Sequence, residues 1–523
     1  MEADPDVCRN IKWEPHMTET YYTGFDNEKY LREQTAAILE RVNRFNNKLY
    51  LEFGGKLLYD LHASRVLPGF DPNVKMRLLQ MLKDKTDVIL CIHAGDIERK
   101  KVRADFGITY DVDALKTIDD FREWGIEVTA VVITRYTGQQ PAKAFRNKLE
   151  HRGVKVYTHS PTLGYPTDVD LIVSDQGYGA NEYIKTTHPI VVVTGPGPGS
   201  GKLATCLCNL YHEYRRGVKA GYAKFETFPI WDLPIDHKVN IAYEAATLDL
   251  KDEVLVDSYH LKTYGENVVN YNRDIEAFHL LKRILEKITG GESMYQSPTD
   301  MGVNRASSGI VNDALIQEAA QQEIIRRYFR CNVEYAIGLA EKEVLDHALN
   351  IMDKVGAKPE DRKVVLPARK AATEAEKGGK GNAGIFCGAA IELGNGHIIT
   401  GKNSTLMHAA SSLVLNATKH MAGLPDSLLL LPKNLIDSVT YLKKDLLNGK
   451  EVSLDVEETL ILLSISALSN PAAQAALEQL TLLRGCEVHL THIPTPGDEA
   501  GLRKLNVNVT CDPEYSSKSL FVS

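Results

Sequence analysis

The sequence has few of the features that mark secreted, membrane-spanning or disulfide-stabilised proteins. Its 523 residues include eight cysteines, and no two of them form a CxxC pair, so neither a disulfide framework nor a cysteine zinc site is expected. No run approaches about 18 consecutive apolar residues. The segment Met1–Glu19 lacks the apolar stretch of a secretory signal. These absences predict a cytoplasmic protein with no membrane partner.

Charge of one sign is not concentrated anywhere in the chain. The 61 basic and 69 acidic residues give a formal net charge of -8, without the basic block that nucleic-acid binding requires. We therefore expect no nucleic-acid partner and a small, locally recognised ligand. The length exceeds the roughly 250–300 residues at which a single core stops growing, so two to four domains are expected.

Zinc-enzyme motifs are also missing. A zinc protease needs HExxH, but the one HE pair, His212-Glu213, is followed by Tyr214, Arg215 and Arg216. A zinc deaminase needs HxE or CxE together with PCxxC, and neither pattern occurs. No zinc motif and no metal-ligating residues are predicted.

Short β-branched runs alternate with amphipathic stretches through the first half of the chain. That alternation is typical of βαβ units. The predicted fold is therefore α/β, with a mostly parallel N-terminal sheet. The expected strands are Lys48–Phe53, Asp87–Ile92, Glu127–Ile133, Val154–Tyr157, Asp170–Val173 and Ile190–Thr194.

Small or polar segments follow four of these expected strands. They are GGK (54–56), HAGD (93–96), SDQGYGAN (174–181) and GPGPGSGK (195–202). Because ligands gather at the carboxyl ends of parallel strands, the four segments predict one shared cleft. Lys56, Asp96 and Asp175 are candidate residues of that cleft. Each of the three is also consistent with an ordinary turn.

The remaining chain predicts three further regions. Helical spacing from Asn312 to Val355 indicates a mainly helical module, taken as residues 291–367, which we expect to support homo-oligomers. Charged and small residues make 368–384 an expected linker. Residues 385–523 form an expected C-terminal α/β subdomain, and residues 1–290 the α/β domain that carries the glycine-rich loop.

The segment from Ile190 to Arg216 combines a buried strand, a glycine-rich turn and a helix. Glycines let backbone N–H groups approach a phosphate, and a helix amino terminus adds partial positive charge. The P-loop pattern GxxxxGK[ST] is only approached, because one extra residue intervenes and Leu203 replaces the hydroxyl residue. The predicted phosphate-binding residues are Gly195, Gly197, Gly199, Ser200, Gly201, Lys202 and Thr205.

A phosphate ligand at this turn indicates candidate catalytic roles. Lys202 would offset developing charge, and Asp175 or Asp96 would position Mg²⁺ or a nucleophile. Mg²⁺ and a nucleoside triphosphate are therefore the expected cofactors. A tight strand-to-helix turn without any ligand is the alternative interpretation.

Two later segments are rich in polar and aromatic residues. Lys224–Thr247 is either a substrate-binding loop or a packed surface loop. Ser297–Arg305 contains Asp300, Asn304 and Arg305, which together with Lys56 are candidate substrate-binding residues.

Long stretches of the chain resemble a known but uncharacterised protein family, catalogued as domain of unknown function 1846. The resemblance implies a C-terminal subdomain similar to the cytidine deaminase-like fold, in which MHAAS (407–411) lies at the position of a zinc motif but lacks the ligand and the glutamate. It supplies no catalytic residues. The stretches that carry it include FGGKLLYDLHASRVLPGF (53–70), VVVTGPGPGSGKLATCL (191–207), SPTDMGVN (297–304) and QEIIRRY (322–328).

The expected function is that of an enzyme that binds a nucleotide or other phosphorylated metabolite, with phosphoryl transfer by a nucleotide-dependent transferase as the reaction. One alternative is a non-catalytic metabolite-binding or oligomeric scaffold protein. Another is a non-phosphoryl enzyme of nucleotide metabolism, in which His408 or Lys402 would matter as much as Lys202.

Overall fold

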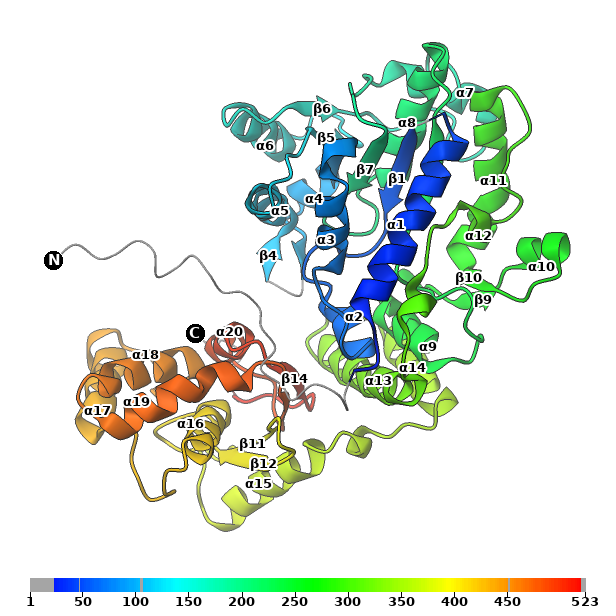
Figure 1. Cartoon of the computed structure of the whole chain (residues 1–523). Helices are drawn as coiled ribbons and strands as arrows, with labels where there is room; N and C mark the ends of the chain where they lie inside the picture. The colour runs from blue at the N-terminus through cyan, green and yellow to red at the C-terminus, as the bar shows by residue number, and fades with distance from the viewer. Residues whose placement is uncertain (1–22, 47, 104–106, 450–451, 519–523) are drawn as a thin grey trace.

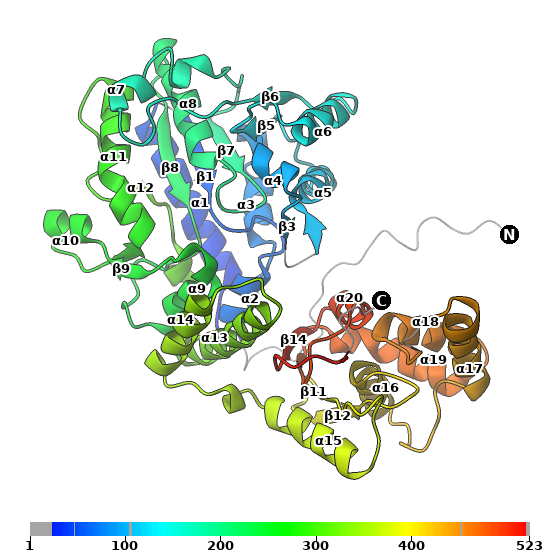
Figure 2. The ribbon, with the colours of Figure 1, turned by 180° about the vertical axis from the view of Figure 1, so that it is seen from behind.

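Six parallel strands form the central sheet of the amino-terminal domain (Figures 1 and 2). Every neighbouring pair in this sheet runs parallel, so all the carboxyl ends meet at one edge. Strand β7 lies near the middle, between β2 and β1. The strands, in spatial order, are β6 (Val156–Thr158), β5 (Ala130–Thr134), β2 (Thr86–His93), β7 (Ile190–Thr194), β1 (Leu49–Phe53) and β8 (Gly221–Phe225).

This description rests on a computed structural model, which describes residues 23–46, 48–103, 107–449 and 452–518. The segment Met1–Glu19, expected to lack a secretory signal, lies outside the described residues. Among the described residues, no helix has both the length and the apolar character needed to cross a lipid bilayer.

Helices cover both faces of the central sheet. Along β2, Val88 and Leu90 face one helical layer, whereas Ile89 and Cys91 face the other. Burial on both faces explains why these strands are continuous apolar runs in the sequence. The first layer contains α1 (Asn27–Arg44), α3 (Val74–Met81), α5 (Tyr110–Glu123) and α6 (Gln140–Glu150), and the second contains α8 (Lys202–Arg215) and α11 (Asn272–Thr289).

Shorter elements connect these layers and surround the edge of the sheet. They are α2 (Leu61–Val66), α4 (Ala94–Glu98), β3 (Val102–Arg103), β4 (Ile108–Thr109), α7 (Val169–Ile172), α9 (Lys238–Ala246), β9 (Val254–Val256), α10 (Ser258–Tyr264), β10 (Val269–Tyr271) and α12 (Pro298–Met301).

Five of the six expected strands are confirmed, and one is wrong. Residues Val169–Ile172 form helix α7, which begins where the Asp168 side chain accepts a hydrogen bond of 3.0 Å from the Leu171 N–H. A short apolar run fits a strand or a buried helical turn equally well, and here the capping residue decides. Strand β8 lies where no strand was expected, and α9 occupies much of the expected loop 224–247.

The expected helical region is confirmed by α13 (Asp313–Ala336) and α14 (Lys342–Lys354). The buried stripe of α13, including Ile316, Ile324 and Phe329, joins the same core as α1 and strand β1. These two helices therefore pack against the amino-terminal sheet domain.

A second sheet organises the C-terminal domain, which we define as residues 360–518. It combines an antiparallel hairpin with a parallel pair, in the order β12-β11-β13-β14. Helix α15 packs on one face of this sheet, and α16 and α20 pack on the other. The elements are α15 (Val365–Lys377), β11 (Gly388–Glu392), β12 (Ile398–Lys402), α16 (Ala409–Met421), α17 (Lys433–Tyr441), α18 (Val456–Ala467), α19 (Pro471–Glu478), β13 (Glu487–Leu490), α20 (Pro496–Lys504) and β14 (Asn508–Cys511).

The segment expected to be a linker, residues 368–384, differs from that expectation over most of its length. Helix α15 extends through Lys377, and its Ala368, Ala371 and Ala375 are buried. Alanine, glutamate and lysine favour a helix, and the small alanines allow close packing on β11. Only the glycine-rich end of the segment, from Gly378 onward, lies outside the helix.

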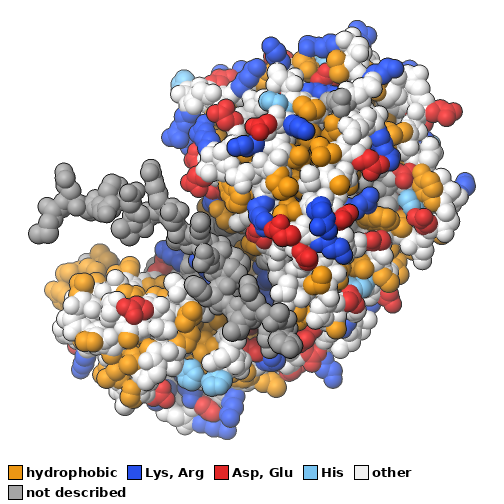
Figure 3. Space-filling view, in the orientation of Figure 1, with side chains coloured by type: hydrophobic (Ala, Val, Ile, Leu, Met, Phe, Trp, Pro, Cys, Tyr) orange, Lys and Arg blue, Asp and Glu red, His pale blue; other side chains and the backbone are white. Residues whose placement is uncertain are grey.

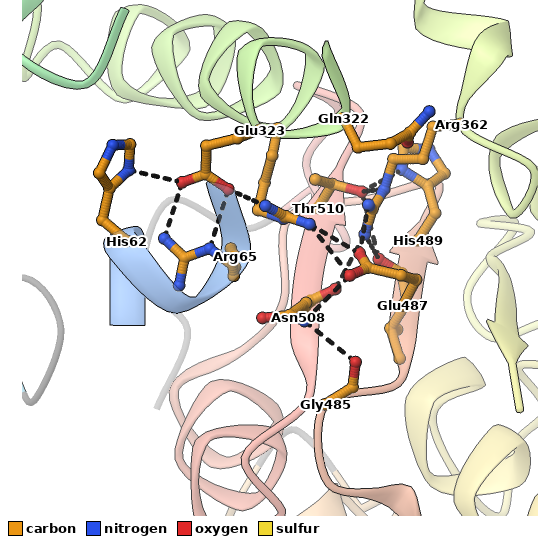
Figure 4. A network of polar contacts seen from close by, with 12 residues as sticks. His62, Arg65, Gln322, Glu323, Arg362, Gly485, Glu487, His489, Asn508 and Thr510 are labelled. Carbon is orange, nitrogen blue, oxygen red and sulfur yellow. Dashed lines mark hydrogen bonds and ion pairs between the residues drawn. The ribbon is translucent and has the colours of Figure 1, made fainter. Parts of the chain in front are cut away.

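Partly buried ion pairs join α13 to the C-terminal sheet (Figure 4). Arg326 of α13 contacts Glu323 on its own helix and donates two hydrogen bonds of 3.0 Å to Glu487 of β13. Arg65 of α2 pairs with Glu323. Arg362 pairs with the same Glu487. One charged network thus connects the region beside the central sheet to the second sheet.

Exposed apolar side chains gather on the C-terminal domain, where Figure 3 shows extensive orange surface. Contiguous apolar surface of this kind is typical of a contact with another molecule. The exposed residues of α17, α18 and the segments beside them include Leu429, Tyr441, Leu442, Leu446, Leu447, Ile461, Ile465 and Leu468.

Candidate functional site at the carboxyl edge of the central sheet

The glycine-rich loop links β7 to α8 at the carboxyl edge of the central sheet. Gly199 and Gly201 have φ values of 75° and 91°, which favour glycine over residues with a Cβ. Gly201 is the N-cap of α8, and no described side chain accepts a hydrogen bond from the first turn of that helix. The amino terminus of α8 therefore keeps N–H groups available for an anion.

Close packing fixes the loop against neighbouring strand ends. A Cβ on Gly195 would lie 2.5 Å from the Cys91 carbonyl oxygen and 2.5 Å from the Ser200 Oγ. A Cβ on Gly197 would lie 2.5 Å from the Tyr110 hydroxyl oxygen. The Thr134 hydroxyl donates a hydrogen bond of 2.7 Å to the Ser200 carbonyl. The loop is thus held by contacts from β2, α5 and β5.

This packing predicts that Gly195→Ala destabilises the protein by about 1–3 kcal/mol, the usual cost of overpacking. The added methyl group would push either the loop or the Cys91 backbone out of place. Gly291→Ala is the matched control, because no heavy atom lies within 4 Å of the position of its added Cβ. Thermal melting of the two variants tests this expectation, and equal melting temperatures would contradict it.

Lys202 and two hydroxyl groups line the inside of the turn. The Lys202 Nζ donates a hydrogen bond of 3.3 Å to the Gly197 carbonyl, so the ammonium group lies across the loop. The Ser200 Oγ is buried and has no hydrogen-bond partner among the described residues. Thr205 is also buried, and its hydroxyl accepts a hydrogen bond of 3.4 Å from the Cys91 thiol. The loop thus holds one cation and one unsatisfied hydroxyl.

A small pocket adjoins this loop. Its lining brings Gly195 and Pro196 together with Lys56, from the segment after β1, and with Arg103 and Asp113. Arg103 donates hydrogen bonds of 2.8 and 2.9 Å to the two carboxylate oxygens of Asp113. Two of the four expected segments, 54–56 and 195–202, therefore meet at one pocket.

The two aspartates proposed as catalytic groups lie in different places. Asp96 is buried in α4 at the end of β2, where it pairs with Arg99 and has the His93 ring nitrogen 3.5 Å away. Asp175 is exposed, and it accepts a hydrogen bond of 2.7 Å from Tyr211 in the last third of α8. Since α7 replaces the strand expected before it, Asp175 does not lie at the carboxyl edge of the sheet.

The expected substrate-binding residues after Ser297 have partners within the fold. Asp300 forms a capping box with Ser297 at the start of α12. Asn304 is buried and donates hydrogen bonds of 3.1 and 3.0 Å to the Thr227 and Pro229 carbonyls. The Arg305 guanidinium donates to the Asn304 carbonyl over 3.3 Å. The Asn304 side chain thus holds the segment that follows β8 in place.

A charged cluster at the end of β8 was not expected from the sequence. The Lys224 Nζ lies 3.0 Å from the Glu226 Oε1 and 2.5 Å from the Asp274 Oδ2. Glu52 of β1 is buried beside it and accepts a hydrogen bond of 2.8 Å from the Tyr222 hydroxyl. The alternation of Tyr222, Lys224 and Glu226 along GYAKFE was the signal that could have indicated a strand.

Burial dominates the electrostatics of this cluster. It raises the pKa of Glu226 to about 7, with Asp274 and Glu52 adding to the effect of burial and the Lys224 ammonium opposing it. The pKa of Tyr243 is also raised, by burial and then by the nearby Glu226. The Glu226 carboxyl group therefore holds a proton more readily than an ordinary glutamate does.

His408 and Lys402, the residues of the non-phosphoryl alternative, lie in the C-terminal domain. His408 is the N-cap of α16, and its Nδ1 lies 2.7 Å from the Asp498 Oδ2. Lys402 pairs with Glu374 of α15 over 2.6 Å. Within the described part of the chain, no group of three His, Cys, Asp or Glu side chains is placed to hold a metal ion.

Fold and site together define a two-domain α/β protein with a glycine-rich turn and a partly exposed charged cluster at the carboxyl edge of a parallel sheet. The chain belongs to the family described as domain of unknown function DUF1846, whose N-terminal model matches residues 23–356 and whose C-terminal model matches residues 360–521.

Curated bacterial proteins are similar to this chain over nearly its whole length. A UPF0371 protein of Clostridium tetani (strain Massachusetts / E88) is 56% identical over 498 residues, which cover 95% of this chain and 99% of that protein. A UPF0371 protein of Clostridium botulinum (strain ATCC 19397 / Type A) is 57% identical over 499 residues, with the same coverage.

Proposed function

We propose that the protein is an enzyme that binds a nucleotide or another phosphorylated metabolite at the loop from Gly195 to Lys202. The observation that carries this proposal is the uncapped amino terminus of the 14-residue helix α8, with the Lys202 ammonium group held across the loop in front of it. Backbone N–H groups and a lysine at one place are the combination that recognises a phosphate dianion.

Three further observations support the proposal. The loop follows β7, near the middle of a parallel sheet, where ligands of such folds gather. The buried Ser200 hydroxyl lacks a partner among the described residues, and a phosphate oxygen or a bound Mg²⁺ would provide one. Lys56 adds a second cation to the adjoining pocket. With a nucleoside triphosphate in the loop, Lys202 would offset charge developing during phosphoryl transfer.

We expect Mg-ATP, Mg-GTP or a sugar phosphate to raise the melting temperature of the purified protein, and Lys202→Ala to abolish the rise. A ligand at about 100 times its Kd adds about 2.7 kcal/mol to the stability of the folded state. Scanning fluorimetry against a panel of these compounds measures the effect. Lys219→Ala is the control, because Lys219 is exposed beyond the opposite end of α8.

The outcomes separate binding from turnover. A panel that leaves the melting temperature unchanged contradicts the proposal, and so does a rise that survives in Lys202→Ala. A ligand that shifts melting but returns chemically unchanged after long incubation would make the protein a metabolite-binding protein instead of an enzyme.

A further inference from the structure

The charged cluster at the end of β8 is made from three elements. Lys224 and Glu226 come from β8 and the residue after it, Glu52 from β1 and Asp274 from the first turn of α11. Lys224 is the one ammonium group among these four, and it contacts Glu226 and Asp274 directly. About a quarter of each of these three side chains is exposed, so a ligand can reach them.

The side chain of Glu226 lies over the carboxyl end of β1. Phe53 and Phe225 are paired in register, so Glu226 and Gly54 follow them side by side. A Cβ on Gly54 would lie 2.4 Å from the Glu226 Cγ and 2.5 Å from its Oε1. Only glycine at position 54 leaves room for this arrangement. The carboxyl group therefore leans from β8 across β1, and β7 with its glycine-rich loop is the next strand along the sheet.

The separation of the two sites limits the ligand that could use both. Strands β7 and β8 flank β1, so their ends are roughly 10 Å apart at about 4.8 Å per strand spacing. The lean of Glu226 across Gly54 shortens this gap. A phosphate held by the loop and a reacting group beside Glu226 would then belong to one molecule with several carbon atoms between them.

We propose that Glu226 and Lys224 form a proton-transfer site for the carbonyl end of a phosphorylated hydroxycarbonyl compound, such as a sugar phosphate. The proposal rests on the proposed function, because the loop must hold the phosphate. A carboxylate base beside an ammonium group is the pair needed to remove a proton from carbon next to a carbonyl group. Asp274 orients Lys224 through their 2.5 Å contact.

The step balances without any further reactant. The bond between hydrogen and the carbon next to the carbonyl breaks, and its electron pair forms the carbon–carbon double bond of an enediolate. The proton passes to the Glu226 carboxylate, which becomes a carboxylic acid. Lys224 stabilises the negative charge on the former carbonyl oxygen. Return of a proton to the same carbon completes an exchange. Protonation of the former carbonyl carbon completes an isomerisation, with the proton of the neighbouring hydroxyl group passing to the former carbonyl oxygen.

Deuterium incorporation from D₂O tests this step directly. The protein is incubated with glucose 6-phosphate, fructose 6-phosphate, ribose 5-phosphate, ribulose 5-phosphate or glyceraldehyde 3-phosphate, and the recovered compound is analysed by mass spectrometry. We expect deuterium at the carbon next to the carbonyl in at least one compound. Glu226→Gln should slow its incorporation by about 100-fold or more, the usual contribution of a general base.

Two control variants exclude a merely structural effect. Glu276→Gln changes an exposed glutamate of α11 and should leave incorporation unchanged. Glu226→Asp keeps the carboxyl group, so incorporation should be measurable again, more slowly than in the wild-type protein. Melting temperatures of both Glu226 variants verify that they fold.

Failure of this inference is distinguishable from failure of the proposed function. If phosphorylated compounds shift melting through Lys202 but none of the five incorporates deuterium, the proton-transfer site is overturned and the phosphate site stands. Incorporation that is as fast in Glu226→Gln as in the wild-type protein also overturns it. If neither these five compounds nor Mg-ATP nor Mg-GTP shifts melting, and none of the five incorporates deuterium, both proposals fail.

Discussion

Arg362→Ala is expected to lower the free energy of unfolding of the C-terminal domain by about 3–5 kcal/mol, the usual cost of removing one partner of a buried ion pair. The Arg362 side chain is 1% exposed. It pairs with Glu487 and donates hydrogen bonds of 3.1 and 2.9 Å to the Val488 and Asn508 carbonyls. Alanine would remove the Arg362 donor from both carbonyls, whereas Glu487 would keep its hydrogen bonds from Arg326 and the Val488 carbonyl its hydrogen bond from the Thr510 hydroxyl.

Arg326 keeps its own two hydrogen bonds to Glu487 in this variant, so the loss falls on the contacts that Arg362 makes with the carbonyls of β13 and β14. Burial alone would raise the pKa of Glu487, but Arg326 and Arg362 together hold it below its ordinary value. A carboxyl group whose pKa is lower in the folded protein than in the unfolded chain stabilises the folded state at pH values above its unfolded-state pKa. This stabilisation is lost as the pH falls through its folded-state pKa. The difference in the free energy of unfolding between Arg362→Ala and the wild-type protein should therefore become smaller at acidic pH.

The distribution of tryptophan makes this prediction measurable. Trp124 and Trp231 belong to the amino-terminal domain, and residues 360–518 contain no tryptophan. With Trp13 replaced by phenylalanine, fluorescence therefore reports on the first domain and circular dichroism on both. During urea unfolding of Arg362→Ala, we expect an early loss of circular dichroism without a change in fluorescence. Arg484→Ala, an exposed position in the same domain, should behave as the wild-type protein does. A single coincident transition at the wild-type midpoint would refute the expectation.

The central sheet was predictable because its strands are buried on both faces. Runs such as Ile190–Val193 are apolar and rich in β-branched residues, and the glycine-rich segment after this run marks its end. Strand β8 escaped prediction because its Lys224 interrupts the apolar run and is stabilised by Asp274, which is distant in sequence. Helix α7 was mistaken for a strand because four residues are too few to reveal a period.

The candidate site was predictable only where it is continuous in sequence. The loop from Gly195 to Lys202 carries its own signal, since the glycines and the lysine are neighbours. The cluster around Glu226 draws on β1, β8 and α11, and no local pattern links Glu52 to Asp274. Asp175 was placed in the cleft on the strength of an expected strand before it, but α7 takes that place and Asp175 lies beside Tyr211 of α8.

Lys75→Met is expected to lower the free energy of unfolding of the amino-terminal domain by about 3–5 kcal/mol, as for other broken buried ion pairs. Lys75 of α3 is 1% exposed, and its Nζ donates hydrogen bonds of 2.9 Å to Asp60 and 3.0 Å to the Lys56 carbonyl. Methionine keeps most of the side-chain volume but leaves the Asp60 carboxylate buried without its cation. Urea unfolding followed by tryptophan fluorescence measures the loss, with Lys83→Met at an exposed position as the control.

Adding Asp60→Asn to Lys75→Met should recover much of the loss, because removing both charges leaves no carboxylate unpaired. The amide oxygen of the introduced asparagine could still cap α2, where the Asp60 side chain accepts from the Ala63 N–H over 3.2 Å.

Burial alone would raise the pKa of Asp60, but Lys75 outweighs burial and lowers it. The ion pair between Lys75 and Asp60 therefore stabilises the wild-type protein at pH values above about 3.9, the pKa of an aspartate in the unfolded chain. This stabilisation is lost as the pH falls through the lower pKa that Asp60 has in the folded protein. The difference in the free energy of unfolding between Lys75→Met and the wild-type protein should therefore shrink below about pH 4. A difference that stays constant between neutral pH and about pH 3 would contradict this expectation. It would show that lost packing destabilises the variant, and not the unpaired carboxylate.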